Sequence, residues 1–296
     1  GKVVGTADPR ASTARELAEM MVGATLNPPA RRPGEKGKVM LGVSDLSVAS
    51  PIPFGTSLKN VAFTVAAGEV LGIAGVAGNG QDELLLALSG ELKASPDRVR
   101  IDDAPVGDLG PIDRRRAGMV SAPEDRLGHA AAPDMSLIEN AFLTAQVRKG
   151  LTNKGFIDWP ATRAYAEAVI KDFDVRTPGA HVAARALSGG NLQKFVVGRE
   201  LMQAPKVIVI NQPTWGVDAA AAASIRQAIL DRAAEGAAVV VISQDLDELL
   251  EIADRFAVLN EGRLTQPRPV EGLTIDEIGL MMGGAHGMEV AHHAEA

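Results

Sequence analysis

The chain has 296 residues, of which 46% are hydrophobic and 23% are charged, and its formal net charge is -7 at pH 7. This composition is ordinary for a globular protein with a sizeable core, and the acidic balance argues against a nucleic-acid partner, which usually meets a basic face. The sequence contains no cysteine, which excludes disulfides and thiolate metal sites, and no apolar run approaches the roughly 18 residues that span a bilayer.

The two ends of the chain carry a short repeat. Residues 1–23 (GKVVGTADPRASTARELAEMMVG) align without gaps with residues 262–284 (GRLTQPRPVEGLTIDEIGLMMGG), and Gly, Thr, Glu, Met-Met and Gly recur at matching positions. Both segments are expected to end as short amphipathic helices opened by a Ser or Thr cap. Coincidence would supply two or three such matches, so we interpret the whole set as a duplication. Residues 1–23 would then be the tail of a preceding copy, whose remainder lies upstream of Gly1.

The next segment favours a linker, and an α/β pattern follows it. Residues 24–38 (ATLNPPARRPGEKGK) are rich in Pro, Gly and charge. From Val39 onward, strand patterns alternate with helical ones, which predicts an α/β fold with a mostly parallel sheet. Residues 136–180 look mostly helical and are expected to form an insertion between the two halves of the sheet. The predicted strands are 39–48, 60–65, 68–75, 207–211, 237–243 and 255–259, and the predicted helices are 82–90, 219–235 and 245–253.

The final residues, 285–296, are predicted to be a disordered tail. Metal binding by its three histidines (His286, His292 and His293) is an alternative, but a solvated terminus is the expected state.

A glycine-rich turn, GVAGNGQD (75–82), lies between a predicted strand and a predicted helix, which is the context of a P-loop. Gly75 and Gly80 have the P-loop spacing, and Gly78 adds a third flexible point. Glycines at these positions let backbone N–H groups close on phosphate oxygens at the positive end of the helix. The turn therefore predicts a phosphate cradle, with a turn that holds no ligand as the alternative.

The charged parts of a P-loop are replaced. Gln81 stands at the lysine position and Asp82 at the hydroxyl position. A neutral hydrogen bond is worth roughly 0.5–1.5 kcal/mol and a charged one roughly 1.5–3 kcal/mol, so Gln81 is expected to weaken γ-phosphate binding without abolishing it. Asp82 adds negative charge beside an anion and removes the Ser/Thr magnesium ligand. We expect nucleotide binding, if present, to be weak.

The most specific signal is ALSGGNLQKFVVGREL (186–201). It is similar to the LSGGQ signature of ABC ATPases, with Asn191 in place of the glutamine. Ser188 and the two glycines after it would offer a hydroxyl and free N–H donors at a helix start, which suit a γ-phosphate. The strand KVIVINQPTWGVD follows at the distance that this family requires.

On these motifs, residues 39–284 resemble an ABC transporter nucleotide-binding domain, and the duplication points to tandem-domain importers of simple sugars and nucleosides. The segments GNGQDEL, SGGNLQK and QPTWGVD are most similar to the second domain of the nucleoside branch. The resemblance implies a P-loop ATPase core with a mostly parallel sheet, antiparallel strands near the N-terminus, and an inserted helical subdomain at about 125–185. Residues 1–23 would be the tail of the first nucleotide-binding domain.

The resemblance also implies residue roles and cofactors. ATP or ADP would be the ligand, with Mg²⁺ bound weakly if at all, and Asn211 would be the weak magnesium candidate. Phe54 is a candidate to stack on adenine, although a core phenylalanine is an equal alternative. SAPEDR (121–126) would occupy the Q-loop with Glu124 near its glutamine, and DMSLIENAFL (134–143) would start the subdomain that faces the membrane subunits. The implied nucleotide contacts are Gly75, Gly78, Asn79, Gly80, Gln81, Asp82, Phe54 and Glu124, the implied signature residues are Ser188, Gly189, Gly190, Asn191 and Gln193, and Asp218 is the implied D-loop aspartate.

Four groups that hydrolysis needs are replaced by amides. Gln81 replaces the lysine, and Gln244 replaces the switch histidine. Asn211 replaces the metal aspartate and Gln212 replaces the general base. Loss of a general base alone costs typically 10²–10⁴ in rate. We therefore expect no catalytic residue in this half and no turnover by the isolated chain.

The resemblance implies an asymmetric pair. This half would supply its signature to the competent P-loop of the missing first domain. Its other partners would be transmembrane permease subunits and, indirectly, a periplasmic or lipoprotein substrate-binding protein, at the cytoplasmic face of the inner membrane. The alternatives are a P-loop hydrolase acting alone, an ABC protein of translation or repair, and a regulatory or structural ABC module that binds nucleotide weakly or not at all. The acidic charge argues against the second, and the missing Lys, Glu and His argue against the first.

Overall fold

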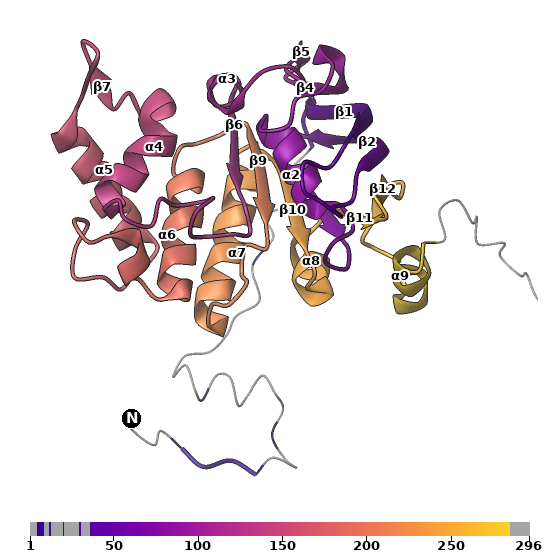
Figure 1. Cartoon of the computed structure of the whole chain (residues 1–296). Helices are drawn as coiled ribbons and strands as arrows, with labels where there is room; N and C mark the ends of the chain where they lie inside the picture. The colour runs from indigo at the N-terminus through magenta and orange to yellow at the C-terminus, as the bar shows by residue number, and fades with distance from the viewer. Residues whose placement is uncertain (1–4, 9–11, 13–19, 21–29, 31–35, 285–296) are drawn as a thin grey trace, which may run out of the picture.

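The computed structural model describes residues 5–8, 12, 20, 30 and 36–284 (Figure 1). Most of the first repeat copy, most of the predicted linker and the predicted tail with its three histidines lie outside the described residues. The second repeat copy is described. Its helix α9 (Ile275–Met282) begins with a capping box between Thr274 and Glu277, as the sequence predicts.

An antiparallel sheet forms the N-terminal part of the described chain. Its strand order is β2-β1-β4-β5, and β1 pairs with both β2 and β4. Alternate residues of β2 are buried, which is typical of a sheet with one face on the core. The bounds are β1 (Val39–Val48), β2 (Leu58–Ala66), β4 (Val99–Ile101) and β5 (Ala104–Pro105).

The central sheet is parallel across five neighbouring strands, from β11 to the edge strand β6. Its order is β12-β11-β3-β10-β9-β6, and β12 and β13 pair antiparallel with β11. Runs of β-branched residues form β9 and β10 because both faces of these strands are buried. Along β9, Val207 and Val209 pack toward the antiparallel sheet, whereas Ile208 and Ile210 pack toward the helices. The bounds are β3 (Val70–Ala74), β6 (Met119–Ala122), β9 (Val207–Asn211), β10 (Ala238–Ser243), β11 (Arg255–Asn260), β12 (Arg263–Leu264) and β13 (Arg268–Pro269).

The helices begin mostly at side-chain caps. Asp158, Asp218 and Asp245 accept backbone N–H bonds at the starts of α5, α7 and α8, and a Ser136–Glu139 capping box starts α4. The remaining bounds are α2 (Gln81–Ser89), η1 (Pro96–Arg98), α3 (Pro111–Ala117), α4 (Leu137–Lys149), β7 (Thr152–Asn153), β8 (Phe156–Ile157), α5 (Trp159–Asp172), η2 (Ala184–Ala186), α6 (Gly189–Leu201), α7 (Ala219–Ala234) and α8 (Leu246–Ile252).

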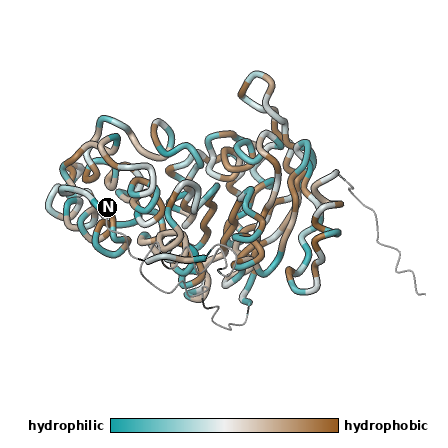
Figure 2. The backbone as a smooth tube through the Cα atoms, turned by 90° about the horizontal axis from the view of Figure 1, so that it is seen from below, coloured by the Kyte–Doolittle hydropathy of each residue, from teal (hydrophilic) through white to brown (hydrophobic). Residues whose placement is uncertain are grey.

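Helices α4 and α5 lie at the opposite end of the molecule from β1 and β2 (Figure 1). The stretch 136–180 is mostly helical, as predicted, and the short hairpin β7–β8 separates its two helices. Residues 154 and 155, Lys and Gly, both have positive φ and form the turn of this hairpin. Figure 2 shows hydrophobic residues concentrated along the interior strands. Among the described residues, no helix has both the length and the apolar character that crossing a membrane requires.

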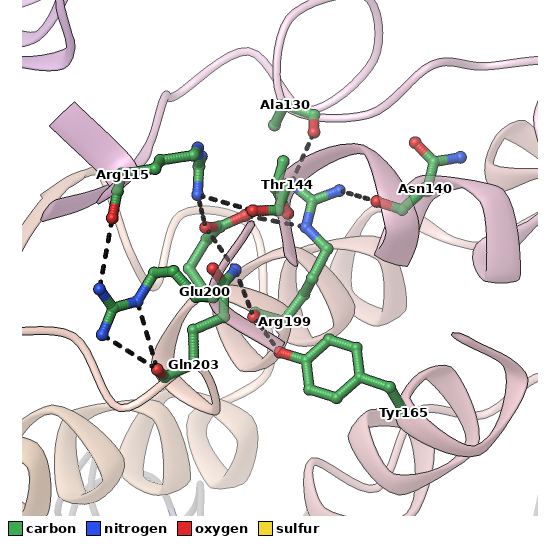
Figure 3. Close-up of polar contacts among 9 residues, drawn as sticks. Arg115, Ala130, Asn140, Thr144, Tyr165, Arg199, Glu200 and Gln203 are labelled. Atoms are coloured by element: carbon green, nitrogen blue, oxygen red, sulfur yellow. Dashed lines mark hydrogen bonds and ion pairs between the residues drawn. The ribbon is translucent and has the colours of Figure 1, made fainter. Parts of the chain in front are cut away.

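A buried polar network joins this helical insertion to α6 (Figure 3). The Glu200 carboxylate is fully buried and accepts hydrogen bonds from Arg115 Nη1 at 2.7 Å and Arg199 Nε at 2.9 Å. Burial alone would raise the pKa of Glu200, but the two arginines outweigh it and lower the pKa, so the group is ionised. Arg199 also donates to the carbonyl oxygens of Asn140 and Ala130, which fixes the loop before α4 against α6.

Candidate functional site

The glycine-rich turn lies between β3 and α2, as the sequence predicts. Gly78 and Gly80 adopt positive φ values of 85° and 108°, which favour glycine. A Cβ at Gly75 would come within 2.6 Å of the Leu259 carbonyl oxygen, so β11 closes against the turn there. The backbone therefore has the shape of a phosphate cradle.

The interior of this cradle is filled by the Gln81 side chain. Gln81 is 8% exposed, its Nε2 donates to the Val76 carbonyl at 2.8 Å, and its Oε1 accepts the Asn79 backbone N–H at 3.0 Å. The Asn79 side chain also turns inward to the protein, because its Oδ1 accepts the Glu261 backbone N–H at 2.8 Å. A neutral amide thus pairs with one N–H group and one carbonyl group of the turn that would cradle a phosphate.

Asp82 and Asn211 pair with each other at the foot of the cradle. Asn211 Nδ2 donates to Asp82 Oδ1 at 3.0 Å, and burial, followed by the charge of Glu83, raises the pKa of Asp82. Asn211 is fully buried, and its Oδ1 has no hydrogen-bond partner among the described residues. Mg²⁺ is usually held by carboxylates together with phosphate oxygens. Because the carboxylate already accepts an amide donor and Gln81 fills the cradle, these residues do not fit a magnesium nucleotide in this arrangement.

A pocket of about 730 Å³ opens beside the cradle. It brings together eight of the seventeen residues that the sequence singled out, and Phe54 is among those that it does not include. Its predicted members are Gly78, Gln81, Asp82, Glu124, Gly189, Asn211, Gln212 and Gln244.

The charge of this pocket is mainly negative. Burial, and then the charge of Asp82, raises the pKa of Glu124, and Asp125 adds a third carboxylate to the wall. His129 Nε2 lies 2.8 Å from Glu91 Oε2, and this hydrogen bond raises the pKa of His129. The wall thus combines three carboxylates, Asp82, Glu124 and Asp125, with the guanidinium of Arg126. The described residues hold no group of three or more His, Cys, Asp or Glu side chains placed to bind a metal ion.

Phe54 lies fully exposed with a φ of 65°, so the alternative that it is a core residue is wrong. Its neighbour Ile52 lines the pocket instead.

The signature serine and glycines start α6 as predicted, and Ser188 and Gly189 are exposed. The Ser188 side chain makes no capping bond to the helix, which leaves the first N–H groups of α6 without intrahelical acceptors. Asn191 Nδ2 donates to Ser188 Oγ at 2.9 Å, and Asn191 Oδ1 accepts the Arg176 N–H at 2.8 Å. Unlike the cradle, this group of donors is open to an outside ligand.

The segment after β9 is held tightly. Gln212 is buried with a φ of 54°, and Gln193 Nε2 donates to the carbonyl oxygens of Gln212 at 3.1 Å and Pro213 at 2.9 Å. The Gln244 backbone N–H lies 3.4 Å from Gln212 Oε1. Asp218 accepts the Ala221 N–H at 2.9 Å and caps α7.

Two further side chains of this region were not predicted from the sequence. Arg126 reaches Gln193 and the Trp215 carbonyl, and burial lowers its pKa. Glu248 is buried on α8 and accepts hydroxyl bonds from Thr214 at 2.6 Å and Ser243 at 2.8 Å, while burial raises its pKa. Arg126 stands in the quoted SAPEDR motif, where an arginine two residues after Glu124 was the available signal. A carboxylate on an amphipathic helix gives no such signal.

Known proteins resemble this chain over nearly its whole length. The family model described as ABC transporter matches residues 58–215. A glucose import ATP-binding protein of Haloferax volcanii is 38% identical and is aligned over 96% of this chain and 52% of its own length. Nucleoside and guanosine import ATP-binding proteins of Lactococcus lactis and Bacillus subtilis are each 32% identical, over 97% and 96% of this chain and 56% of their own lengths. The chain spans about half the length of these curated relatives.

Solved structures share the fold. A dimeric ATP-binding cassette bound to ADP and phosphate has a TM-score of 0.67 at 22% identity and covers 79% of this chain and 100% of its own. An ATP-binding subunit of an ABC transporter has a TM-score of 0.66 at 21% identity and covers 82% and 99%. The P-loop core, the antiparallel strands and the helical insertion are thus those of an ATP-binding cassette.

Proposed function

The chain belongs to the ABC transporter family, whose members bind ATP, and from this premise we propose that it is the degenerate second nucleotide-binding half of an importer for simple sugars or nucleosides. Residues 39–284 form this half, residues 1–23 are the tail of the first half, and 24–38 link the two. Two observations support the proposal: the chain spans about half of each curated relative, and those relatives are named as glucose, nucleoside and guanosine import ATP-binding proteins.

The contrast between the two ends of the ATP-binding surface carries the proposal. Gln81 fills its own cradle at 8% exposure, whereas Ser188 and Gly189 lie exposed at the start of α6. The hydrolytic positions Gln212 and Gln244 carry amides, which have no useful proton affinity near neutral pH. This half therefore supplies its signature residues to the ATP site of the partner half and does not hydrolyse nucleotide itself.

In this role, Ser188 and the N–H groups at the start of α6 complete the ATP site of a competent partner half. They stabilise negative charge on the terminal phosphate that the partner's P-loop holds. Asn191 orients the serine hydroxyl through its 2.9 Å hydrogen bond. The loop that ends at Asp218 faces the same interface with the partner half.

The partners follow from this role. The first nucleotide-binding half contacts the signature face, and permease subunits contact the helical insertion at the cytoplasmic face of the membrane. A substrate-binding protein acts indirectly, on the permease. The net charge of -7 disfavours a nucleic-acid partner.

The test compares two substitutions in the intact protein that contains this half. Gly189→Asp places a carboxylate at the start of α6, where its Cβ also meets Arg126 Nη1, and should abolish ATP hydrolysis. Gln81→Ala acts only on the glycine-rich turn of this half and should retain most of the activity. Phosphate release by the assembled transporter is the measurement. Loss of activity in Gln81→Ala together with full activity in Gly189→Asp would reverse the assignment of the two sites. Full activity in both would favour a structural module that takes no part in hydrolysis.

A further inference from the structure

The loop between β9 and α7, residues 212–218, is held by side chains from three other segments. Gln193 on α6 donates to the first two carbonyl oxygens of the loop, at 3.1 and 2.9 Å. Glu248 on α8 accepts the Thr214 hydroxyl at 2.6 Å. Arg126, from the segment after β6, donates through Nη2 to the Trp215 carbonyl oxygen. We call this loop the D-loop, because it ends at Asp218.

Arg126 is the side chain that touches both the D-loop and the signature helix. Its Nε donates to Gln193 Oε1 at 2.9 Å, and this bond turns the Nε2 of the same amide toward the D-loop. The guanidinium fills the space that two glycines leave. A Cβ at Gly189 would come within 2.8 Å of Nη1, and a Cβ at Gly216 within 3.1 Å of Nη2.

The backbone of Arg126 is itself fixed. Its carbonyl accepts the Ala131 N–H at 2.9 Å, and the Asp125 carbonyl accepts the Ala130 N–H at 2.9 Å, which closes residues 125–131 into a turn. The buried Arg199 on α6 donates to the Ala130 carbonyl at 2.8 Å. The turn and the signature helix therefore form one rigid support for the guanidinium.

We propose that Arg126 is a positioning residue that locks the D-loop to the signature helix, so that both surfaces facing a partner domain are held as one unit. This role requires the planar guanidinium group, because it donates two hydrogen bonds at once in different directions. Nε donates to Gln193, and Nη2 donates to the Trp215 carbonyl oxygen. A lysine carries the same charge but has a single donor centre. The function of this lock in hydrolysis rests on the proposed function, whereas the lock itself does not.

Amide hydrogen exchange on the 296-residue chain tests the lock directly. Arg126→Gln and Arg126→Lys should both speed exchange at 214–218 by at least about tenfold, because a charge-assisted bond and the orientation of Gln193 are lost together. Exchange in β10 should not change. The control is Arg185→Gln, since the Arg185 side chain is 67% exposed and pairs with Asp134 on the surface. Unchanged exchange at 214–218, or wild-type exchange in Arg126→Lys, would overturn the proposal.

A second variant keeps the test decisive if Arg126 substitutions fail to fold. Gln193→Glu keeps an acceptor for Arg126 Nε but removes the donor to the carbonyl oxygens of Gln212 and Pro213. It should speed exchange at 214–218 as well. In the double variant Arg126→Gln/Gln193→Glu the two effects should be less than additive, because both remove the same lock. Additive effects would show that the two side chains act independently, against the proposal.

ATP hydrolysis by the intact protein tests the consequence. Arg126→Gln should lower kcat by at least about tenfold with little change in KM for ATP, because Arg126 orients the signature and does not hold the nucleotide. Ser188→Arg in the same assay separates the two proposals. If Ser188→Arg silences hydrolysis but Arg126→Gln leaves kcat unchanged, the positioning role is wrong and the proposed function stands. If Ser188→Arg has no effect while exchange responds to Arg126→Gln, the proposed function is wrong and the lock stands.

Discussion

At the scale of single residues, the cradle shows how one side chain changes a binding site. Gln81 is long enough to fold back into its own loop, where its amide supplies both an acceptor for the Asn79 N–H and a donor for the Val76 carbonyl. A lysine has no acceptor and could not satisfy both groups. These polar groups of the turn are therefore hydrogen-bonded to Gln81 itself. The carboxylate of Asp82 beside them would repel a phosphate.

Restoring the two P-loop residues should restore nucleotide binding. In Gln81→Lys/Asp82→Ser, a charged donor replaces a neutral one and a carboxylate beside the phosphate is removed. We expect ATP affinity in the presence of magnesium to rise by at least about tenfold, since the gain from a charged hydrogen bond alone approaches 1.4 kcal/mol. Titration calorimetry measures it. Gln266→Lys, which adds the same charge at an exposed position outside the pocket, is the matched control. Equal affinity in all three proteins would contradict this account of the cradle.

Glu248 predicts a pH dependence of stability. Burial raises its pKa in the folded protein, although the hydroxyls of Thr214 and Ser243 oppose the shift. Because the folded pKa lies above the unfolded one, the favourable contribution of the protonated group is full at low pH and is lost as pH rises through the folded pKa. Glu248→Gln removes this loss. Its free energy of unfolding relative to wild type should therefore increase between pH 4.5 and pH 8, measured by urea denaturation, and a decrease would be the wrong sign.

At the scale of elements, the two ends of α6 have different surroundings. Its first turn is exposed at Ser188 and Gly189, whereas its last turn is buried around Arg199 and Glu200. The buried end ties the helix to α3 through Arg115 and to the loop before α4 through Arg199. The signature is therefore presented by a helix that is anchored at its far end.

Removing the charge of Glu200 should be strongly destabilising. Glu200→Gln keeps the shape of the side chain but leaves Arg199, which is 2% exposed, without its buried counter-charge. We expect a loss of about 3–5 kcal/mol in the free energy of unfolding, measured by chemical denaturation. The control is Asp113→Asn on α3, where the pair with Arg116 is 51% and 61% exposed and should be worth at most about 1 kcal/mol. A loss at Glu200 as small as that of the control would show that the network is not a buried ion-pair site.

At the scale of the whole molecule, the proposed function makes the ATP-binding surface incomplete in one chain. The signature of this chain is exposed, whereas the Gln81 side chain binds back to its own glycine-rich turn and carboxylates line the pocket beside it. Under the proposed function, this surface takes part in hydrolysis when another domain supplies the cradle.

The isolated chain should not hydrolyse ATP above background. The lysine, general-base and switch-histidine positions (Gln81, Gln212 and Gln244) all carry amides, and the loss of a general base alone costs typically 10²–10⁴ in rate. Phosphate release with magnesium present is the measurement, and Gln212→Ala reports the contribution of contaminants. A turnover near 1 per second, at the low end of typical enzymes, that disappears in Gln212→Ala would contradict the prediction.

Long elements were predictable from the sequence, and short ones were not. The sequence alone indicates the runs of β-branched residues in β9 and β10 and the capping box of α9. Hydrophobic periodicity and helix caps are both patterns of a few neighbouring residues. In contrast, β6 has four residues, and the β7–β8 hairpin has two in each strand. Patterns this short carry no distinct period, and pairing with β9 alone makes β6 part of the central sheet.

The same division holds for the site. The sequence by itself determined the family, the position of the cradle and signature, and the amides at the hydrolytic positions, because each is a matter of residue type at a fixed spacing. Only the tertiary structure decided that Gln81 turns inward, that Phe54 lies exposed, and that Arg126 meets Gln193 and Trp215 from 67 and 89 residues away. Contacts across such separations depend on how the turn after β6, the start of α6 and the end of β9 pack at one edge of the sheet. No local pattern encodes that packing, because it arises from the burial of the whole core.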